Sequence, residues 1–416
     1  MEPGLLIAYL ALGTMAVAPI YFGSFAALKI PKKKDTTRGK KGQNEEEEED
    51  IEEDEAEFFR LEDAYWFPVF GSLALVSLYV VFKYLNKEYL NALFTAYFSI
   101  LGVGAAIKSF LGISRAVTGW KIKGEYRVDL WKKEKEIASY HFGNYHLFLI
   151  VLSIIIAGLY AMTKHWILNN IYGEAFSASA IQLLNLDSFK TGMALLSFLF
   201  LYDIFWVFGT DVMVTVAKGF DAPVKVLWPK DIVGLIQSGF FTTEGVPFTL
   251  LGLGDIVIPG IFVALCLQFD HHQYLNSKKG KKNKYTQSFP KPYFTVCFIA
   301  YALGLVTTVV VMHTFQAAQP ALLYLSPACI LSVLLTGLVR GELKQVFAFA
   351  PAEKESPKKT LEHIADDLKI ENTAASEDDL GTYGSEGATS EQEGSRNRKG
   401  KKKTGTSGKR KAAKKQ

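Results

Sequence analysis

Two aspartates interrupt long apolar stretches of this sequence: Asp203 lies in SFLFLYDIFWVFG and Asp255 lies in FTLLGLGDIVIPGIF. Such stretches are typical of segments buried in lipid, where an acidic residue costs roughly 2.5–3.5 kcal/mol on insertion scales. Two carboxyl groups that lie close together share one proton, because they cannot both ionise readily. The ionised group can then activate water while the protonated group polarises a carbonyl, which is the chemistry of peptide hydrolysis by paired aspartates. The two residues are therefore candidates for acid–base catalysis within a membrane.

The position of each aspartate predicts that the two can meet. Each is expected well inside its spanning helix, about two to three turns from the nearer end. Consecutive spans run antiparallel, so residues at mid-depth on them can face each other. Gly252 and Gly254, just before Asp255, carry no Cβ and allow the backbone to leave helical geometry. An unwound segment at membrane depth is tolerated where it lines a water-filled cavity, and it could pair with an extended substrate by strand addition.

Other interpretations of the same residues stay open at this point. A single aspartate in a span often serves helix packing or transport, and a GxGD pattern alone is weak. The pair could therefore bind a cation or relay protons in a transporter or leak channel, or the chain could escort membrane proteins without cutting them. The segment Gln319-Pro320-Ala321-Leu322 indicates only the start of a helix, where proline is ordinary.

The elements that must position these residues are apolar blocks of about 20 residues, the length that crosses a bilayer core. The first block is expected to be a retained helix, because it lacks the basic region of a signal peptide. The fifth is the weakest, since Asn169, Asn170 and Glu174 interrupt it. We predict an all-α polytopic membrane protein with nine spans, at about 4–28, 66–86, 89–112, 145–164, 166–185, 190–214, 246–269, 292–313 and 318–340.

The charges predict the orientation. The formal net charge is +4, and the strongly basic loops follow the first, third, seventh and ninth spans. By the positive-inside rule the N-terminus is luminal and the C-terminus cytosolic. Asp211 is then expected near the luminal interface as a solvated carboxylate. The predicted organisation is 1–28, first helix; 29–65, a charged disordered cytosolic loop; 66–185, helices two to five; 186–342, catalytic helices six to nine; 343–416, a disordered cytosolic tail with a basic end.

No metal or other cofactor is expected. Cys266, Cys297 and Cys329 lie in separate apolar blocks without paired spacing, which makes a disulfide framework or a thiolate metal site improbable. The seven histidines show no HExxH pattern or other close ligand spacing. The basic tail is expected to be solvated or drawn to anionic lipid, and nucleic acid is not an expected partner.

Three longer motifs carry a family resemblance: LYDIFWVFGTDVMVTVAKGFDAPVKVLWP, then LGLGDIVIPGIFVAL, then QPALLYLSP. Over roughly 60–340 the chain resembles the signal peptide peptidase family of GxGD-type intramembrane aspartyl proteases, which is related to the presenilins. The resemblance implies that Asp203 and Asp255 are the catalytic pair. It also implies that the shared YD, GxGD and PAL motifs support the site, through Tyr202, Gly252, Leu253, Gly254, Gln319, Pro320, Ala321 and Leu322.

The resemblance further implies the biology. Substrates would be remnant signal peptides and type II membrane segments, cut in the bilayer without obligatory partner subunits, by a monomer or a homo-oligomer. The membrane would be that of the endoplasmic reticulum. The chain departs from the family's dilysine ending, since Lys414 and Lys415 precede Gln416. Glu174 is a second departure, because an apolar residue is expected there on physical grounds.

Overall fold

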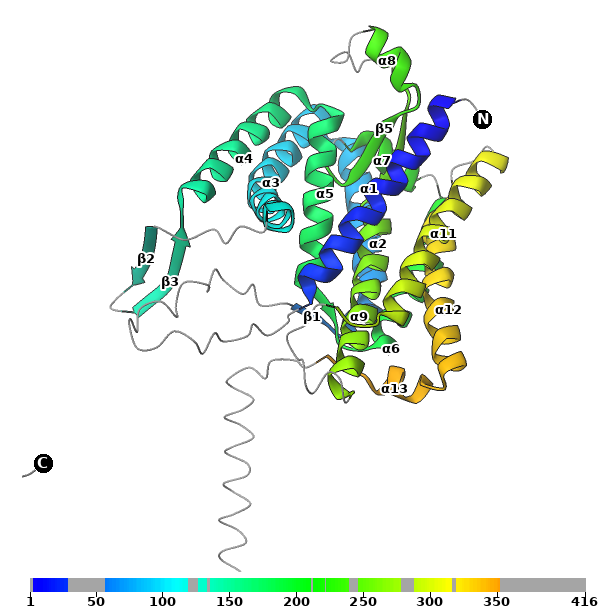
Figure 1. Ribbon diagram of the computed structural model, residues 1–416. Helices are drawn as coiled ribbons and strands as arrows, with labels where there is room; N and C mark the ends of the chain where they lie inside the picture. Colours follow the sequence, from blue (N-terminus) through cyan, green and yellow to red (C-terminus); the bar gives the residue numbers. More distant parts are fainter. Residues whose placement is uncertain are drawn as a thin grey trace, which may run out of the picture. The chain divides into compact units, whose positions relative to one another are not determined.

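The structure is a computed structural model that describes residues 3–28, 57–118, 126–132, 135–210, 212–220, 222–238, 246–277, 288–315 and 319–351. These residues are mainly helical (Figure 1). The helices are α1 Pro3–Ala27, α2 Leu61–Tyr84, α3 Lys87–Thr118, α4 Asn144–Thr163, α5 Trp166–Leu183, α6 Phe189–Asp203, the π-helix η1 Ile204–Phe208, α7 Val212–Gly219, α8 Ile232–Ser238, α9 Gly254–Asn276, α11 Pro292–Phe315, α12 Leu322–Arg340 and α13 Leu343–Ala348.

Short strands form three two-stranded sheets among these residues, so the all-α prediction is incomplete. Strands β1 and β4 pair in parallel, whereas the pairs β2–β3 and β5–β6 are antiparallel. The strands are β1 Glu57–Phe59, β2 Tyr126–Lys132, β3 Lys135–Phe142, β4 Leu184–Leu186, β5 Lys225–Pro229 and β6 Phe248–Gly252.

Eight helices of the described residues are long and apolar enough to cross a membrane, which confirms a polytopic helical membrane fold. They are α1, α2, α3, α4, α6 continued by η1, α9, α11 and α12. Helix α5 occupies the predicted fifth span but is not among them. It packs against α1, α3, α9 and β5, as expected for a helix whose polar residues face protein. The count of nine spans and the orientation stay predictions.

Two predicted spans have different bounds in the structure. The seventh, placed at 246–269, is the strand β6 followed by α9, which runs on to Asn276. The sixth, placed at 190–214, is α-helical only to Asp203 and then widens into η1. Hydropathy alone missed both changes, because an apolar strand or π-turn is as hydrophobic as an α-helix.

Other predictions fall at the edges of the described ranges. Ordered elements occur where the sequence predicted loop or tail: β1 and the first turn of α2 precede residue 66, and α13 follows residue 342. Residues 29–56, residues 352–416 and Asp211 lie outside the described part of the chain.

Helix α9 forms the centre of the packing and contacts α1, α5, α6, α11 and α12 (Figure 1). Its side chains Phe262, Val263 and Leu267 are fully buried. Helix α6 approaches it closely at Gly192, where a Cβ would lie 2.6 Å from the ring of Phe262. The glycine therefore sets the short separation between the two helices that carry the aspartates.

Hydrogen bonds at the helix ends fix where these helices begin and stop. The Ser188 hydroxyl accepts the Thr191 N–H at 3.2 Å and caps the start of α6. Gly341, with φ of 67°, ends α12 in the left-handed conformation and lets the chain turn into α13.

Candidate functional site

Asp203 is the last residue of α6 and is 5% exposed. Its carboxyl group accepts a hydrogen bond from the backbone N–H of Leu322, the first residue of α12. The chain continues from Asp203 into the π-helix η1, a distortion found frequently at functional sites. The segment Gln319-Pro320-Ala321-Leu322, which residue physics alone assigned only to a helix start, thus directly contacts one of the two aspartates.

Asp255 lies in the first turn of α9 and is partly exposed. Its carboxyl group is within electrostatic interaction range of Asp203. The structure therefore brings the two aspartates together, as predicted. The predicted position of Asp255 within its helix was wrong, however, because Asp255 lies in the first turn of α9; Asp203 ends α6 but is followed by η1 within the same candidate span. They meet where the regular helices are interrupted, which is where irregular backbone can line a polar cavity.

The GxGD segment runs from the end of β6 into α9, so the unwound backbone predicted from its glycines is present. A Cβ at Gly252 would lie 3.4 Å from a carboxyl oxygen of Asp255, whereas no atom of the described residues lies within 4 Å of a Cβ at Gly254. Gly252 therefore lies against the carboxyl group, and Gly254 borders open space. Leu253 connects the two, and its N–H donates to the Val224 carbonyl at 2.9 Å.

Strand β6 is held in place by β5, with Val226 opposite Leu251 and Lys225 opposite Gly252. The other edge of β5 is occupied by α5. The Asn170 side chain donates to the Leu227 carbonyl at 2.6 Å and accepts the Leu227 N–H at 2.8 Å. Asn169 donates to the Lys225 carbonyl at 2.7 Å. The two asparagine side chains thus make hydrogen bonds to the backbone of β5, as a neighbouring strand would. They hold the β5–β6 sheet, which leads to Asp255, in place.

Tyr202, beside Asp203, contacts α2 and η1. Its ring lies 3.7 Å from the position of a Cβ on Gly71 and 6.2 Å, centroid to centroid, from the Trp206 ring. The Trp206 indole N–H in turn donates to the Ser72 hydroxyl at 3.1 Å. Tyr202 therefore packs the end of α6 against α2.

The residues just before α12 make hydrogen bonds with the beginning of that helix. The Gln319 side-chain oxygen accepts the Tyr324 hydroxyl at 3.4 Å, and the carbonyl of Pro320 accepts the Leu323 N–H at 3.3 Å. Ala321 is 6% exposed and starts the α12 hydrogen bonding, since its carbonyl accepts the Leu325 N–H at 3.0 Å. These contacts fix the helix start whose first N–H reaches Asp203.

Sequence reasoning missed three residues of this arrangement. Asn169 and Asn170 were visible only as polar interruptions of a span, and Tyr301 gave no signal. The Tyr301 side chain is fully buried, and its hydroxyl donates to the Asp255 carbonyl at 3.3 Å.

Comparison with known proteins assigns the chain to a family. The family profile described as signal peptide peptidase matches residues 51–353, a range that includes both aspartates and the segment before α12. The chain belongs to the signal peptide peptidase family. It is 38% identical to the signal peptide peptidase of Mus musculus over 385 residues, which cover 90% of this chain and 89% of the mouse protein. It is also 38% identical to the Homo sapiens protein of that name over 359 residues, covering 85% and 86%.

A third relative extends the comparison beyond animals. A Schizosaccharomyces pombe protein named a probable intramembrane protease is 39% identical over 298 residues, which cover 72% of this chain and 86% of that protein. Membership of the signal peptide peptidase family makes this multi-span membrane protein an intramembrane peptidase. The comparisons do not support the transporter, channel or escort interpretations.

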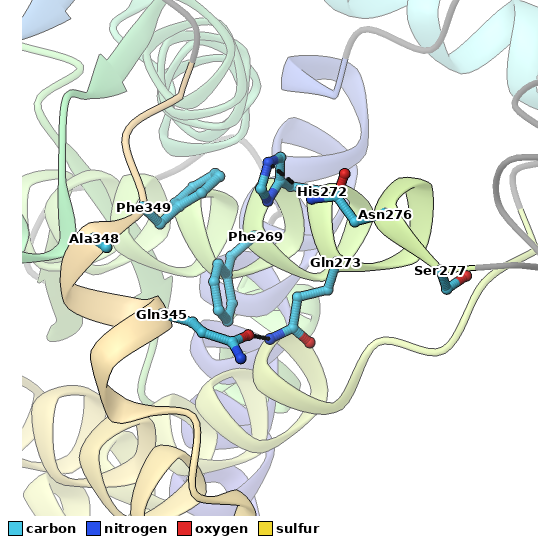
Figure 2. Close-up of a pocket in the computed structure, with 8 residues that line it drawn as sticks. All are labelled: Phe269, His272, Gln273, Asn276, Ser277, Gln345, Ala348 and Phe349. Atoms are coloured by element: carbon cyan, nitrogen blue, oxygen red, sulfur yellow. Dashed lines mark hydrogen bonds between the residues drawn. The ribbon is translucent and has the colours of Figure 1, made fainter.

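A pocket of about 500 Å³ in this family member lies at the other end of α9, between α9 and α13 (Figure 2). The amide of Gln273 donates across it to the Gln345 side chain at 3.3 Å. Phe269, which lines it, follows Asp255 by 14 positions along the helix, or roughly 20 Å. The pocket is therefore separate from the aspartates.

The three cysteines Cys266, Cys297 and Cys329 are free and buried, in α9, α11 and α12 respectively. The Cys297 thiol lies 4.0 Å from the Cys329 carbonyl. Among the described residues, no group of three or more His, Cys, Asp or Glu side chains is placed to hold a metal ion.

Proposed function

We propose that Asp203 and Asp255 are the catalytic pair of an aspartyl endopeptidase that hydrolyses peptide bonds of transmembrane segments within the bilayer. The observation that carries this proposal is the meeting of the two carboxyl groups, from the end of α6 and the start of α9, beside the Leu322 N–H. Support also comes from the open space next to Gly254, where a substrate backbone can approach.

The pair acts as a unit that holds one proton. The ionised carboxylate takes a proton from water as the water oxygen attacks the scissile carbonyl carbon, while the protonated carboxyl donates to the carbonyl oxygen. The tetrahedral diol collapses when its C–N bond breaks: the carboxyl group that now holds the water proton gives a proton to the leaving nitrogen, while the other carboxylate takes a proton from a diol hydroxyl. The products are a carboxylic acid and an amine, and the pair again holds one proton. The Leu322 N–H keeps the Asp203 carboxyl oriented through these steps.

Strand β6 is the element that we propose receives the substrate. Among the described strands it pairs only with β5, so its second edge can accept an extended segment by strand addition. A transmembrane helix must unwind locally to make this pairing. Residues that weaken the substrate helix near the cut should therefore speed cleavage, and their replacement by leucine should slow it.

The remaining assignments follow the resemblance and the basic loops. We propose nine spans with a luminal N-terminus, catalytic helices within 186–342 and helices two to five within 66–185 as their support. Gln319, Pro320 and Ala321 shape the site through the start of α12, and Tyr202 does so through α2. The substrates are remnant signal peptides and type II segments in the endoplasmic reticulum membrane, cut without obligatory partner subunits by a monomer or a homo-oligomer.

The test is cleavage by the purified chain in detergent, with a transmembrane peptide that has the apolar core of a signal sequence and products identified by mass spectrometry. Wild type, Asp203→Asn, Asp255→Asn and the matched control Asp231→Asn are compared. Asp231 is exposed and caps the short helix α8 by accepting the Gly234 N–H at 3.0 Å. Cuts within the apolar stretch should occur with wild type and the control and should vanish in both site variants.

Two outcomes would overturn the proposal. Cleavage that survives in either site variant would remove that aspartate from the mechanism. Ion flux through reconstituted protein that depends on both aspartates, with no peptide product, would indicate that the two aspartates serve ion transport instead of hydrolysis.

A further inference from the structure

The register of the β5–β6 pair shows which residues of β6 point toward its open edge. The Leu253 N–H donates to the Val224 carbonyl at 2.9 Å, so these two residues are a hydrogen-bonded pair. Such pairs alternate with non-hydrogen-bonded pairs along an antiparallel ladder, and Leu250 opposite Leu227 is one of the latter. The N–H and C=O of Leu227 therefore point away from β6, where Asn170 binds them. Those of Leu250 point away from β5, toward the open edge.

The side chain of Leu250 lies on the same face of the ladder as the Asp255 carboxyl group. Side chains alternate between the two faces of a strand, so Leu250 and Gly252 share one face. A Cβ at Gly252 would lie 3.4 Å from a carboxyl oxygen of Asp255, which places the carboxyl group on that face. The opposite face packs on α5, where Val226 of β5 lies 3.1 Å from the position of a Cβ on Gly173. Leu250 therefore belongs to the face on which cleavage is proposed.

Leu250 is exposed, in contrast to its two neighbours in β6. Its side chain is 57% exposed, whereas Thr249 and Leu251 are each 8% exposed. The Thr249 hydroxyl donates to the Trp228 carbonyl at 2.9 Å, and Leu251 belongs to the main hydrophobic core. These two residues hold β6 in place. The apolar side chain of Leu250 is left available to a molecule that approaches the aspartates along the open edge.

An extended substrate on this edge must place one residue directly opposite Leu250. Opposite residues of a hydrogen-bonded antiparallel pair have Cα atoms about 5.5 Å apart and side chains on the same face, in contact. Strand β6 runs toward Asp255, which is from lumen to cytosol in the proposed orientation. A type II segment runs the other way and would pair antiparallel. Its residue opposite Leu250 would then follow its residue opposite Gly252 by about two positions.

We propose that Leu250 is a specificity-determining residue that contacts the substrate side chain opposite it and selects an apolar residue there. The inference deepens the proposed function and rests on it, because it refines the addition of the substrate to β6. The peptide bond that is cut lies beside Gly252, within reach of Asp255. The selected residue therefore lies on the C-terminal side of the cut, about two residues away from it.

Disulfide cross-linking of the purified full-length chain tests the geometry. Leu250→Cys is combined with Asp255→Asn, which should keep the substrate uncut, and with transmembrane peptides that carry one cysteine at successive positions. Glutathione disulfide is the oxidant, and the three native cysteines are each 0% exposed. A disulfide needs Cα atoms about 4.4–6.8 Å apart, so the yield should peak at one position C-terminal to the cut and drop at both adjacent positions. Leu159→Cys, exposed on α4, is the matched control and should give no cross-link.

Cleavage tests whether this contact selects the substrate. Two peptides, with leucine or serine at the position that cross-links, are compared by kcat/KM. Wild type should prefer leucine about threefold to fivefold, the effect of an apolar cross-strand contact. In Leu250→Ser this ratio should fall to about one, whereas Leu159→Ser should keep the wild-type ratio. Because the ratio is measured within one variant, a general loss of folded protein does not change it.

The inference is wrong if the cross-linking yield peaks on the N-terminal side of the cut or recurs every three to four positions, as for a helical substrate. It is also wrong if Leu250→Ser keeps the wild-type preference for leucine. Cleavage by Asp203→Asn and Asp255→Asn is measured in the same series. If both are inactive while Leu250→Ser keeps the wild-type ratio, the inference fails and the proposed function stands. If either aspartate variant still cleaves, the proposed function itself fails.

Discussion

The side chain of Asn170 offers a sharp test of how α5 supports the site. Its amide group makes two hydrogen bonds to the backbone of Leu227 in β5, at 2.6 and 2.8 Å, and is 7% exposed. Leucine has nearly the same shape without the polar atoms. Asn170→Leu would therefore fill the space and leave the N–H and the carbonyl of Leu227 without partners on this edge.

The expected loss follows from those two groups. A buried backbone donor or acceptor left unsatisfied costs about 1–3 kcal/mol, so the free energy of unfolding should fall by about 2–6 kcal/mol. The displaced strand β5 pairs with β6, which leads directly to Asp255. A displacement of about 1 Å at a catalytic group can lower rates about a hundredfold, so kcat/KM should fall by at least about tenfold.

The assay compares unfolding temperature and peptide cleavage in detergent for wild type, Asn170→Leu and Asn276→Leu. Asn276 is exposed at the other end of α9 and serves as the matched asparagine control. Asn170→Leu should lose both stability and cleavage, while Asn276→Leu should keep both. An Asn170→Leu protein as stable and active as wild type would refute the view that α5 fixes the β5–β6 sheet.

Three further predictions concern packing and charge. Gly192→Ala should lower the free energy of unfolding by about 1–3 kcal/mol, because the new Cβ would press on Phe262, and a smaller residue at 262 should restore part of the loss. Asp270 is 2% exposed, and its carboxyl group accepts hydrogen bonds from two backbone N–H groups at the start of α11, at 2.8 and 3.3 Å. Asp270→Leu should therefore lower the free energy of unfolding by about 2–6 kcal/mol, and Asp270→Asn should lower it clearly less. Burial alone would raise the pKa of Glu342, but hydrogen bonds, above all from Arg340, hold that pKa below its ordinary value of 4.5. Its stabilisation should be present above about pH 4.5 and lost as pH falls through the lower folded value, so the stability difference between wild type and Glu342→Gln should shrink on acidification.

The sequence predicted the helical membrane fold and the pair of aspartates because both depend on local signals. Apolar blocks of spanning length stand out, and an aspartate within such a block is costly enough to attract notice. Gly252 and Gly254 also predicted the unwound backbone before Asp255, which the structure confirms as the end of β6.

The rest depended on contacts between distant segments. Nothing local indicates that Asn170 completes a strand pairing with Leu227, 57 positions away, or that the Tyr301 hydroxyl reaches the Asp255 carbonyl. The position of Asp255 within its helix was misjudged, because the sequence FTLLG has the hydrophobicity of an apolar helix but forms the strand β6. The role of Leu322 was equally hidden, since its backbone N–H has no signature in sequence.

The central claim is that Asp203 and Asp255 form one site, and inhibitor binding tests it most directly. A transition-state analogue with a hydroxyl in place of the attacked carbonyl must contact both carboxyl groups at once. Its Kd is measured for folded wild type, Asp203→Asn, Asp255→Asn and the control Asp231→Asn. We predict that wild type and the control bind equally and that each site variant binds at least about a hundredfold more weakly. Wild-type affinity in either site variant would contradict the claim that the two aspartates share a site.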